Sequence, residues 1–175
     1  MSNIVVQKFG GTSLADTDRF KAVAKIIKDT SKKGKKVVAV VSAMAGETQR
    51  LIDLAKKVQE TPDPREYDAL ISSGEQVSVA LLAMTLRNEK VKSKSYTAFQ
   101  LGLRTDDYHG KARINSIDTK NILKDISADI TPVITGFQGV NEEGDITTLG
   151  RGGSDTSAVA LAVALEAEEC QIYTD

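Results

Sequence analysis

The sequence is poor in the residues that cross-link small secreted proteins and hold structural metals. Its 175 residues include one Cys, one His, three Pro and no Trp. Since Cys170 has no second cysteine to pair with, a disulfide framework is excluded, and a cytoplasmic location is the simpler expectation. The single His109 excludes a zinc site that needs two imidazoles, and we predict no metal site. The chain must therefore fold on its apolar core, which at this length can bury roughly two-thirds of the unfolded surface.

Neither sign of charge is in excess. The 23 Lys and Arg against 24 Asp and Glu give a net charge of −1, so the basic face of a nucleic-acid-binding protein is not expected. The lysine-rich stretch 32–36 contains no aromatic residue that could stack on bases, and we interpret it as a solvated turn. No apolar run reaches the roughly 18 residues that span a bilayer, and the first nine residues lack the pattern of a signal peptide. The sequence therefore predicts binding to neither nucleic acid nor membrane.

Strand-like and helix-like segments alternate along the chain. Short apolar or β-branched runs predict the strands, and helical spacing of apolar residues predicts the helices. The expected strands are 4–9, 37–41, 94–99, 130–135, 146–149 and 170–174. The expected helices are 16–33, 51–58, 64–84, 119–126 and 156–165, with a break at 72–75. Residues 102–115 are polar and are expected to be irregular.

This alternation predicts an α/β fold with an open, mostly parallel sheet covered by helices. In such sheets ligands bind beyond the carboxyl ends of the strands. The turns that begin at Gly10, Ser42, Gly136 and Asp175 each follow an expected strand, so we expect them to line one edge. Since Asp175 comes directly after a strand, the chain is expected to be a truncated piece of a longer one.

The first candidate site is the segment 8–13, Lys-Phe-Gly-Gly-Thr-Ser. A cation, two glycines whose N–H groups can approach an anion, and two hydroxyls before a helix suit a phosphate group. The spacing is not that of a P-loop. A plain glycine turn between strand and helix is the alternative, although Lys8 at the end of an inner strand would need a counter-charge.

The second candidate is the segment 150–155, Gly-Arg-Gly-Gly-Ser-Asp, before a helix that is expected to be apolar all round. Arg151 offers a planar fork that matches a carboxylate, and Ser154 or Asp155 would cap the helix. The helix N-terminus adds positive potential. The segment therefore suits a small dianionic acid or a phosphate, with a flexible turn and a solvated Arg151 as the alternative.

Several other residues are candidates for a functional site, but each is weak evidence when taken alone. Glu75 could receive a substrate ammonium or be an ordinary solvated carboxylate. Ser42 and Thr48 flank the loop after the second strand, where they could bind ligand, although helix capping is the simpler role for Thr48. His109 is expected to be an ordinary loop residue, and Cys170 a small residue of a buried strand rather than a nucleophile.

Taken together, several segments closely resemble the aspartokinases of the amino acid kinase family. The resemblance runs from the first strand to the last residue, and the string from Thr147 to Asp155 is its most specific part. The segments that carry it are 8–13, 41–44, 73–75, 136–139, 147–155 and 172–175. The resemblance implies a three-layer α/β/α sandwich and the ATP-dependent phosphorylation of the side-chain carboxylate of L-aspartate to 4-phospho-L-aspartate, the first step towards lysine, threonine and methionine.

The resemblance also implies roles for individual residues. Lys8, Phe9, Gly10, Gly11 and Ser42 would lie at the ATP phosphates, with Lys8 and Asp155 catalytic. Thr48, Glu75, Arg151 and Ser154 would bind aspartate, and Thr174 and Asp175 would begin a loop on the nucleotide side. Residues 1–175 would then be the N-terminal portion of a catalytic domain, containing the aspartate half and the phosphate end of the ATP site. The rest of the ATP half and the ACT-type regulatory domains, through which lysine or threonine would act, would be missing.

The chemistry of the residues agrees with such a reaction. An aspartate side chain is ionised at pH 7, so the acceptor needs no general base. The reaction needs neutralisation of charge around the transferred phosphoryl group, which Lys8, the N–H groups of Gly10 and Gly11, and Mg²⁺ can supply. A homo-oligomer is expected. Two alternatives remain: an anion- or nucleotide-binding chain without catalysis, and a related kinase with another acceptor such as glutamate.

Overall fold

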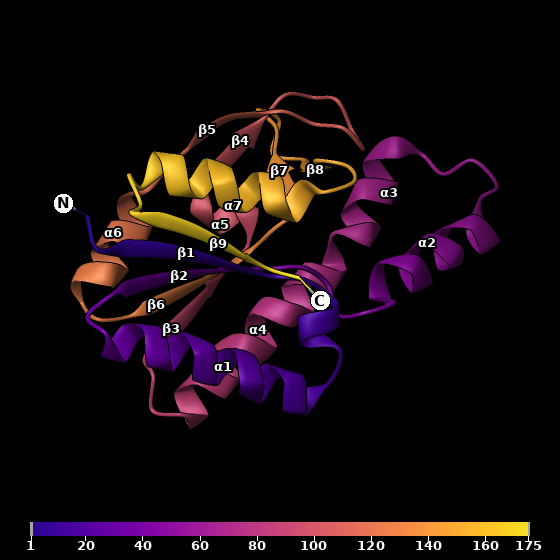
Figure 1. Ribbon diagram of the computed structural model, residues 1–175. Helices are drawn as coiled ribbons and strands as arrows, with labels where there is room; N and C mark the ends of the chain where they lie inside the picture. Colours follow the sequence, from indigo (N-terminus) through magenta and orange to yellow (C-terminus); the bar gives the residue numbers. More distant parts are fainter. Residues whose placement is uncertain (1, 175) are drawn as a thin grey trace.

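A five-stranded parallel sheet organises the chain, and the computed structural model describes residues 2–174 (Figure 1). The spatial order is β3-β6-β2-β1-β9, so the first two strands lie near the centre. Val6 of β1 is paired with Val38 on one side and Cys170 on the other. The strands are β1 (Ile4–Phe9), β2 (Lys36–Val41), β3 (Ser93–Tyr96), β6 (Thr131–Thr135) and β9 (Glu169–Tyr173).

Helices cover both faces of this sheet, which confirms the predicted three-layer α/β/α sandwich (Figure 1). One core lies beneath α1 (Thr17–Lys32) and α4 (Ser73–Asn88) and includes Phe9 and Phe20. The other lies beneath α5 (Ala98–Leu101), α6 (Lys120–Ser127) and α7 (Gly153–Ala164). Asp16 caps α1 by accepting the N–H groups of Asp18 and Arg19, so the helix begins where the sequence predicts.

A second, four-stranded sheet lies beside the first and differs from the expectation for residues 102–115. That stretch is not irregular throughout, because it contains β4 and part of β5. The expected strand 146–149 is confirmed as β8, which forms a hairpin with β7, since Gln138 of β7 pairs with Thr148 of β8 in antiparallel register. In the order β5-β4-β7-β8, the strands are β4 (Leu103–Thr105), β5 (Ile114–Ile117), β7 (Gln138–Val140) and β8 (Ile146–Thr148).

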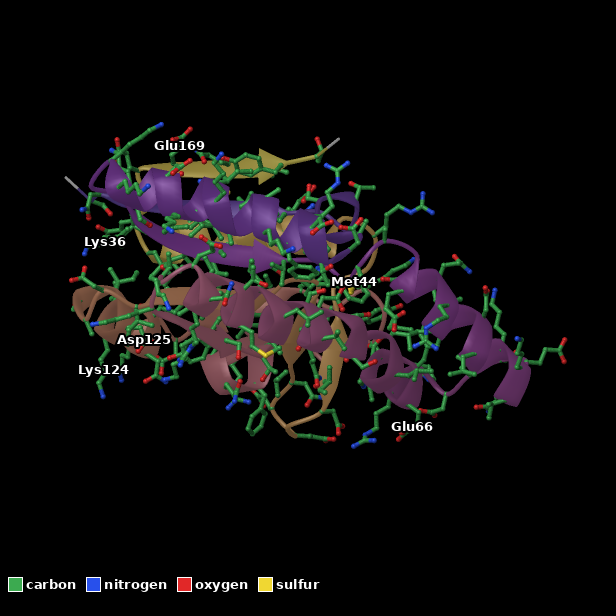
Figure 2. The ribbon with its side chains drawn as sticks, turned by 90° about the horizontal axis from the view of Figure 1, so that it is seen from below. Lys36, Met44, Glu66, Lys124, Asp125 and Glu169 are labelled. Carbon is green, nitrogen blue, oxygen red and sulfur yellow. The ribbon has the colours of Figure 1, made fainter. Side chains whose placement is uncertain are left out.

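Two helices, α2 (Glu47–Val58) and α3 (Pro64–Ile71), extend from the body as a lobe (Figure 1). Asp63 accepts the N–H groups of Arg65 and Glu66, and Pro64 opens α3 as predicted. Figure 2 shows Met44 where the lobe leaves the body and Glu66 on its outer side. Because α2 projects in this way, Leu54 and Val58 are exposed, although their spacing predicts a buried face.

On two other helices, apolar residues that would be expected to be buried are exposed. On α4 the residues Val77 and Met84 are exposed, and Leu82 and Leu86 fill the core instead. The break before α4 is confined to a turn at Ser72. Helix α7 is not buried all round, because Val159 and Val163 face outward. Composition alone could not place these faces, since nearly every position on both helices is apolar or small.

The strands differ from the prediction only in details. The predicted strand 94–99 ends at Tyr96, because Thr97 and Gln100 form a capping box that starts α5. Pro132 is accommodated in the interior strand β6 because pairing with β2 begins only at Val133. Its missing N–H group is therefore not needed there. Cys170 is half-buried on β9, an edge strand of the described sheet.

The helical stretch Pro64–Asn88, which contains α3 and α4, is long and apolar enough to cross a membrane by length and composition alone. Half of its apolar window is buried inside the protein. Leu82 and Leu86 of this stretch are fully buried, and α4 packs against the sheet. These contacts are typical of a core helix of a globular domain.

Candidate active site

A cleft lies where β1, β2 and β6 end, at the edge that the topology predicts for a ligand. Its volume is about 310 Å³. The residues that line it come from β1, the loops after β2 and β6, the first turns of α2, α4 and α7, and the turn after β8. They are Lys8, Ser42, Thr48, Glu75, Phe137, Gly150, Arg151, Gly152, Gly153, Ser154 and Asp155. The structure therefore brings the 150–155 segment together with Lys8, Ser42, Thr48 and Glu75, which the sequence singles out at separate positions.

Lys8 and Asp155 form an ion pair at one end of the cleft. Lys8 is 7% exposed near the end of β1, and its Nζ lies 2.7 Å from Oδ1 of Asp155 in the first turn of α7. A buried ammonium needs a counter-charge, and Asp155 supplies it. The Asp155 side chain keeps 45% of its exposure, so the pair faces the cleft. A cation and an anion at this point can hold a phosphate group and its counter-ion.

The first turn of α7 is brought against the turn after β6 by glycines. A Cβ atom on Gly136 would lie 2.7 Å from Cβ of Ser154, and one on Gly153 would lie 3.0 Å from Cδ2 of Phe137. Only glycine permits this approach. The N-cap is Gly152 at φ +77°, and not Ser154 or Asp155 as predicted. Because Ser154 and Asp155 lie inside the first turn of the helix, their side chains are free to line the cleft.

Glu75 lies at the start of α4 and is 3% exposed. Its Oε1 accepts the N–H of Ala43 at 3.1 Å, and its Oε2 has no hydrogen-bond partner within residues 2–174. Burial raises the pKa of Glu75 to about 7, against the opposing effect of the N–H donor from Ala43. A carboxylate that is buried, half-satisfied and open to a cleft is suited to receive a cation.

Arg151, Thr48 and Ser42 complete the wall of the cleft. Arg151 is exposed in the turn between β8 and α7. Thr48 does not cap its helix, as the simpler interpretation held, because the N-cap of α2 is Gly46 at φ +78°. The hydroxyl of Thr48 is therefore not committed to capping. The N–H of Ser42 donates to the carbonyl of Phe9 at 3.1 Å, which fixes the loop after β2 against the end of β1.

The other residues predicted at the nucleotide lie around the cleft and not in its wall. The ring of Phe9 is fully buried and stacks on Tyr173 with centroids 4.8 Å apart, so only its backbone faces this edge. Gly10 leaves room beside Lys8, since a Cβ there would lie 3.6 Å from Nζ. Gly11 packs against the carbonyl of Ala43, which a Cβ would approach to 2.9 Å. Thr174 is exposed after β9. Asp175 lies outside the described residues.

Sequence reasoning missed two residues, one in the cleft wall and one outside it. Phe137 lines the cleft in a left-handed conformation at φ +68°, and its N–H donates to Oγ of Ser157 at 3.1 Å. Its position after a strand-ending glycine was the available signal. Asp68 is fully buried and forms a hydrogen bond with His109, a long-range contact that leaves no local pattern in the sequence.

The structure also bears on Cys170, which the sequence analysis takes as a small strand residue rather than a nucleophile. Burial raises the pKa of the Cys170 thiol, which disfavours a nucleophilic thiolate.

The acidic side chains of the cleft are few and do not cluster among the described residues. Within residues 2–174, no group of three or more His, Cys, Asp or Glu side chains is placed to hold a metal ion. Asp155 and Glu75 are the carboxylates of the cleft wall, and Asp155 is the more exposed of the two. The site therefore offers one accessible carboxylate beside a lysine.

Three comparisons place this geometry among known proteins. The profile of the amino acid kinase family matches residues 3–175. An aspartate kinase of Stutzerimonas stutzeri is 56% identical over 172 residues, which are 98% of this chain and 42% of that protein. The aspartate kinase structure from Synechocystis superposes with a TM-score of 0.84 at 45% identity, covering 98% of this chain and 28% of that one.

The structure of Escherichia coli aspartokinase III in complex with aspartate and ADP gives a TM-score of 0.88 at 28% identity. It covers 98% of this chain and 49% of that one. The chain thus spans about two-fifths of the length of the curated relatives that it matches.

Proposed function

The chain belongs to the amino acid kinase family, and on that premise we propose that it carries the acceptor site of an ATP-dependent kinase that converts L-aspartate to 4-phospho-L-aspartate. One observation carries the proposal. A single cleft contains a buried carboxylate, Glu75, an exposed guanidinium, Arg151, and a buried ammonium, Lys8, beside a helix N-terminus. These groups complement the ammonium and two carboxylates of aspartate and the phosphate of a nucleotide. The names of the relatives support the same reaction.

In this proposal Glu75 and Arg151 orient the acceptor. The buried carboxylate of Glu75 receives the α-ammonium, which supplies the partner that Oε2 lacks among the described residues. Arg151 binds the α-carboxylate through its planar fork. Thr48 and Ser154 donate hydroxyl hydrogen bonds from two sides of the cleft. With both α-groups held, the β-carboxylate is the group left to approach the phosphate end.

Lys8 and the first turn of α7 then stabilise the charge that develops during transfer. The acceptor carboxylate is ionised at pH 7, so no residue has to remove a proton. Its approach to a phosphate brings like charges together, which the ammonium of Lys8 and the positive end of α7 offset. The N–H group of Gly11 and the hydroxyl of Ser42 lie at the adjacent strand ends and extend this phosphate-binding surface. The N–H of Gly10 is not available for this role as the structure stands, because it donates to the carbonyl of Tyr173 at 3.3 Å.

Magnesium would enter with the triphosphate as part of the nucleotide substrate. It commonly takes one or two protein carboxylates and phosphate oxygens as ligands, and Asp155 fits that need. We assign residues 1–175 to the aspartate half and the phosphate end of the ATP site. That Thr174 and Asp175 begin a nucleotide-side loop, that the protein is a homo-oligomer and that lysine or threonine regulates it stay predictions from the resemblance.

An acceptor panel tests the proposal in the full-length gene product. ADP release is measured with L-aspartate, L-glutamate, N-acetyl-L-aspartate and the α-amide of L-aspartate. We expect turnover with L-aspartate, and a large loss when the ammonium or the α-carboxylate is blocked. Turnover with glutamate in preference to aspartate would indicate a related kinase with another acceptor. Binding of aspartate or phosphate without ADP release would indicate a binding protein.

A further inference from the structure

Asp68 is a fully buried carboxylate that the proposed reaction does not use. It lies in α3, and its residue exposure is 0%. Oδ2 accepts hydrogen bonds from Nδ1 of His109 at 3.0 Å, the N–H of Gly110 at 2.9 Å and the N–H of Thr148 at 2.9 Å. Oδ1 accepts the hydroxyl of Thr148 at 2.7 Å. A carboxylate only accepts hydrogen bonds, so these four donors supply the partners that burial requires.

The donors to Asp68 lie on both sides of the turn that carries Arg151. Thr148 ends β8, three residues before Arg151. Gly110 belongs to the loop between β4 and β5, and its carbonyl oxygen would lie 3.0 Å from a Cβ on Gly150. The N–H of Ala112 also donates to the carbonyl of Thr148 at 2.9 Å. Asp68 therefore joins the start of the turn to the loop against which the turn packs.

Within the turn, the N–H of Gly153 donates to the carbonyl of Gly150 at 3.0 Å, so the backbone closes beneath Arg151. Gly150 and Gly152 both have positive φ angles, +79° and +77°, on either side of Arg151. Glycines in such positions add backbone freedom that must be lost when Arg151 clamps a ligand. An external anchor at the entrance of the turn reduces this loss.

We propose that Asp68 is a positioning residue for Arg151 and thereby sets the affinity for the acceptor's α-carboxylate. The expected effect on kinetics rests on the proposed function. The expected effect on the structure of the turn rests on the hydrogen bonds alone. Asp68 does not reach the cleft wall, and its effect passes through Thr148 and the turn.

A general role in holding α3 on the hairpin is already filled by other contacts. At the start of the helix, Arg65 binds Asp145 in the β7–β8 turn, with Nη2 to Oδ1 at 2.6 Å. At its end, Nε2 of Gln138 donates to the carbonyl of Ser72 at 2.9 Å. Loss of Asp68 would leave these contacts in place and release the part of the hairpin nearest Arg151.

The test compares three variants with wild type. Asp68→Ala removes all four hydrogen bonds. Asp68→Asn keeps the shape: its oxygen can accept the bonds made to Oδ2, and its amide can donate to the Thr148 hydroxyl, which rotates to accept. Arg65→Ala is the matched control, because it removes an exposed contact between the same helix and the same hairpin.

Two readouts separate the inference from the proposed function. Amide exchange at Thr148, Leu149 and Gly153, whose N–H groups donate to Asp68, Phe137 and Gly150, reports the order of the turn in the full-length gene product without any substrate. Steady-state kinetics in the full-length gene product report KM for aspartate, KM for ATP and kcat. We expect Asp68→Ala to speed exchange at these amides and to raise KM for aspartate by about tenfold or more, with KM for ATP changed less than about twofold. Asp68→Asn should restore both readouts to near wild type, and Arg65→Ala should change neither.

Unchanged exchange in a folded Asp68→Ala protein would overturn the inference, as would an equal loss in Arg65→Ala or parallel changes in all kinetic constants. If Asp68→Ala lacks a cooperative thermal transition, Thr148→Val replaces it, because it removes only the hydroxyl bond to Oδ1. Faster exchange at Leu149 and Gly153 then supports the inference, and unchanged exchange overturns it. Failure of the wild type to use aspartate would refute the proposed function and leave the exchange result to decide on Asp68.

Discussion

Replacement of Glu75 by glutamine should change how the stability of the ligand-free chain depends on pH. Burial raises the pKa of Glu75 to about 7 in the folded state, from an ordinary value of 4.5. Between these values the folded protein holds a proton on Glu75 that the unfolded chain has released. Folding therefore takes up a proton, and stability falls as pH rises from 4.5 to about 7.

The size of this effect follows from the interval between the pKa values of Glu75 in the unfolded and folded states. About 2.5 pH units at 1.36 kcal/mol per unit give a loss of about 3 kcal/mol for an otherwise unchanged protein. The glutamine side chain carries no charge at any pH and can still accept the N–H of Ala43. Glu75→Gln should therefore come closest to wild type near pH 5 and exceed its free energy of unfolding at pH 8, by up to about 3 kcal/mol.

Urea denaturation of both proteins at pH 5, 6, 7 and 8 measures this difference. The expected result is a difference in the free energy of unfolding that grows across the series, with equal m-values. A constant difference between the two proteins would refute a raised pKa for Glu75. The same ionisation predicts that aspartate, through its ammonium, binds wild type more weakly below pH 7, since protonated Glu75 offers no negative charge.

Other predictions concern the walls of the cleft. Arg151→Ala should raise KM for aspartate by about 10- to 100-fold and leave KM for ATP nearly unchanged, and the reverse pattern would place Arg151 on the phosphate side. Lys8→Ala should lower kcat by about 100-fold or more while the thermal transition persists, because the lost interaction is with charge that develops during transfer, and near-normal turnover would reduce Lys8 to a structural residue. Gly136→Val should destabilise the protein by about 1–3 kcal/mol through its clash with Ser154, and an unchanged melting temperature would contradict the close approach.

Much of the fold could be predicted from local patterns. The continuous apolar run 37–41 identifies a strand that is buried on both faces, and Asp63 with Pro64 identifies the start of α3. The buried faces of the helices were harder to predict, because Val77 and Val159 fit an apolar face as well as their buried neighbours do. Which face is buried depends on where the helix docks, and a local pattern of small apolar residues does not encode that.

Parts of the site also follow from the sequence, and others depend on distant contacts. Lys8 at the end of an inner strand implies a counter-charge, but its identity as Asp155 requires the fold to bring together two residues from opposite ends of the chain. The role of Gly136 is a contact with Ser154, which spacing does not reveal. Asp68 and its donors come from α3, the loop at 109–110 and β8, so no short motif could have found them.

The most direct test of the central claim is to trap the product of the full-length enzyme with hydroxylamine in the presence of ATP and L-aspartate. An acyl phosphate yields a hydroxamate at the carboxyl group that accepted the phosphoryl group. The orientation by Glu75 and Arg151 predicts the β-hydroxamate of aspartate. Formation of the α-hydroxamate, or no hydroxamate from a folded protein that releases ADP, would contradict the assignment of this cleft.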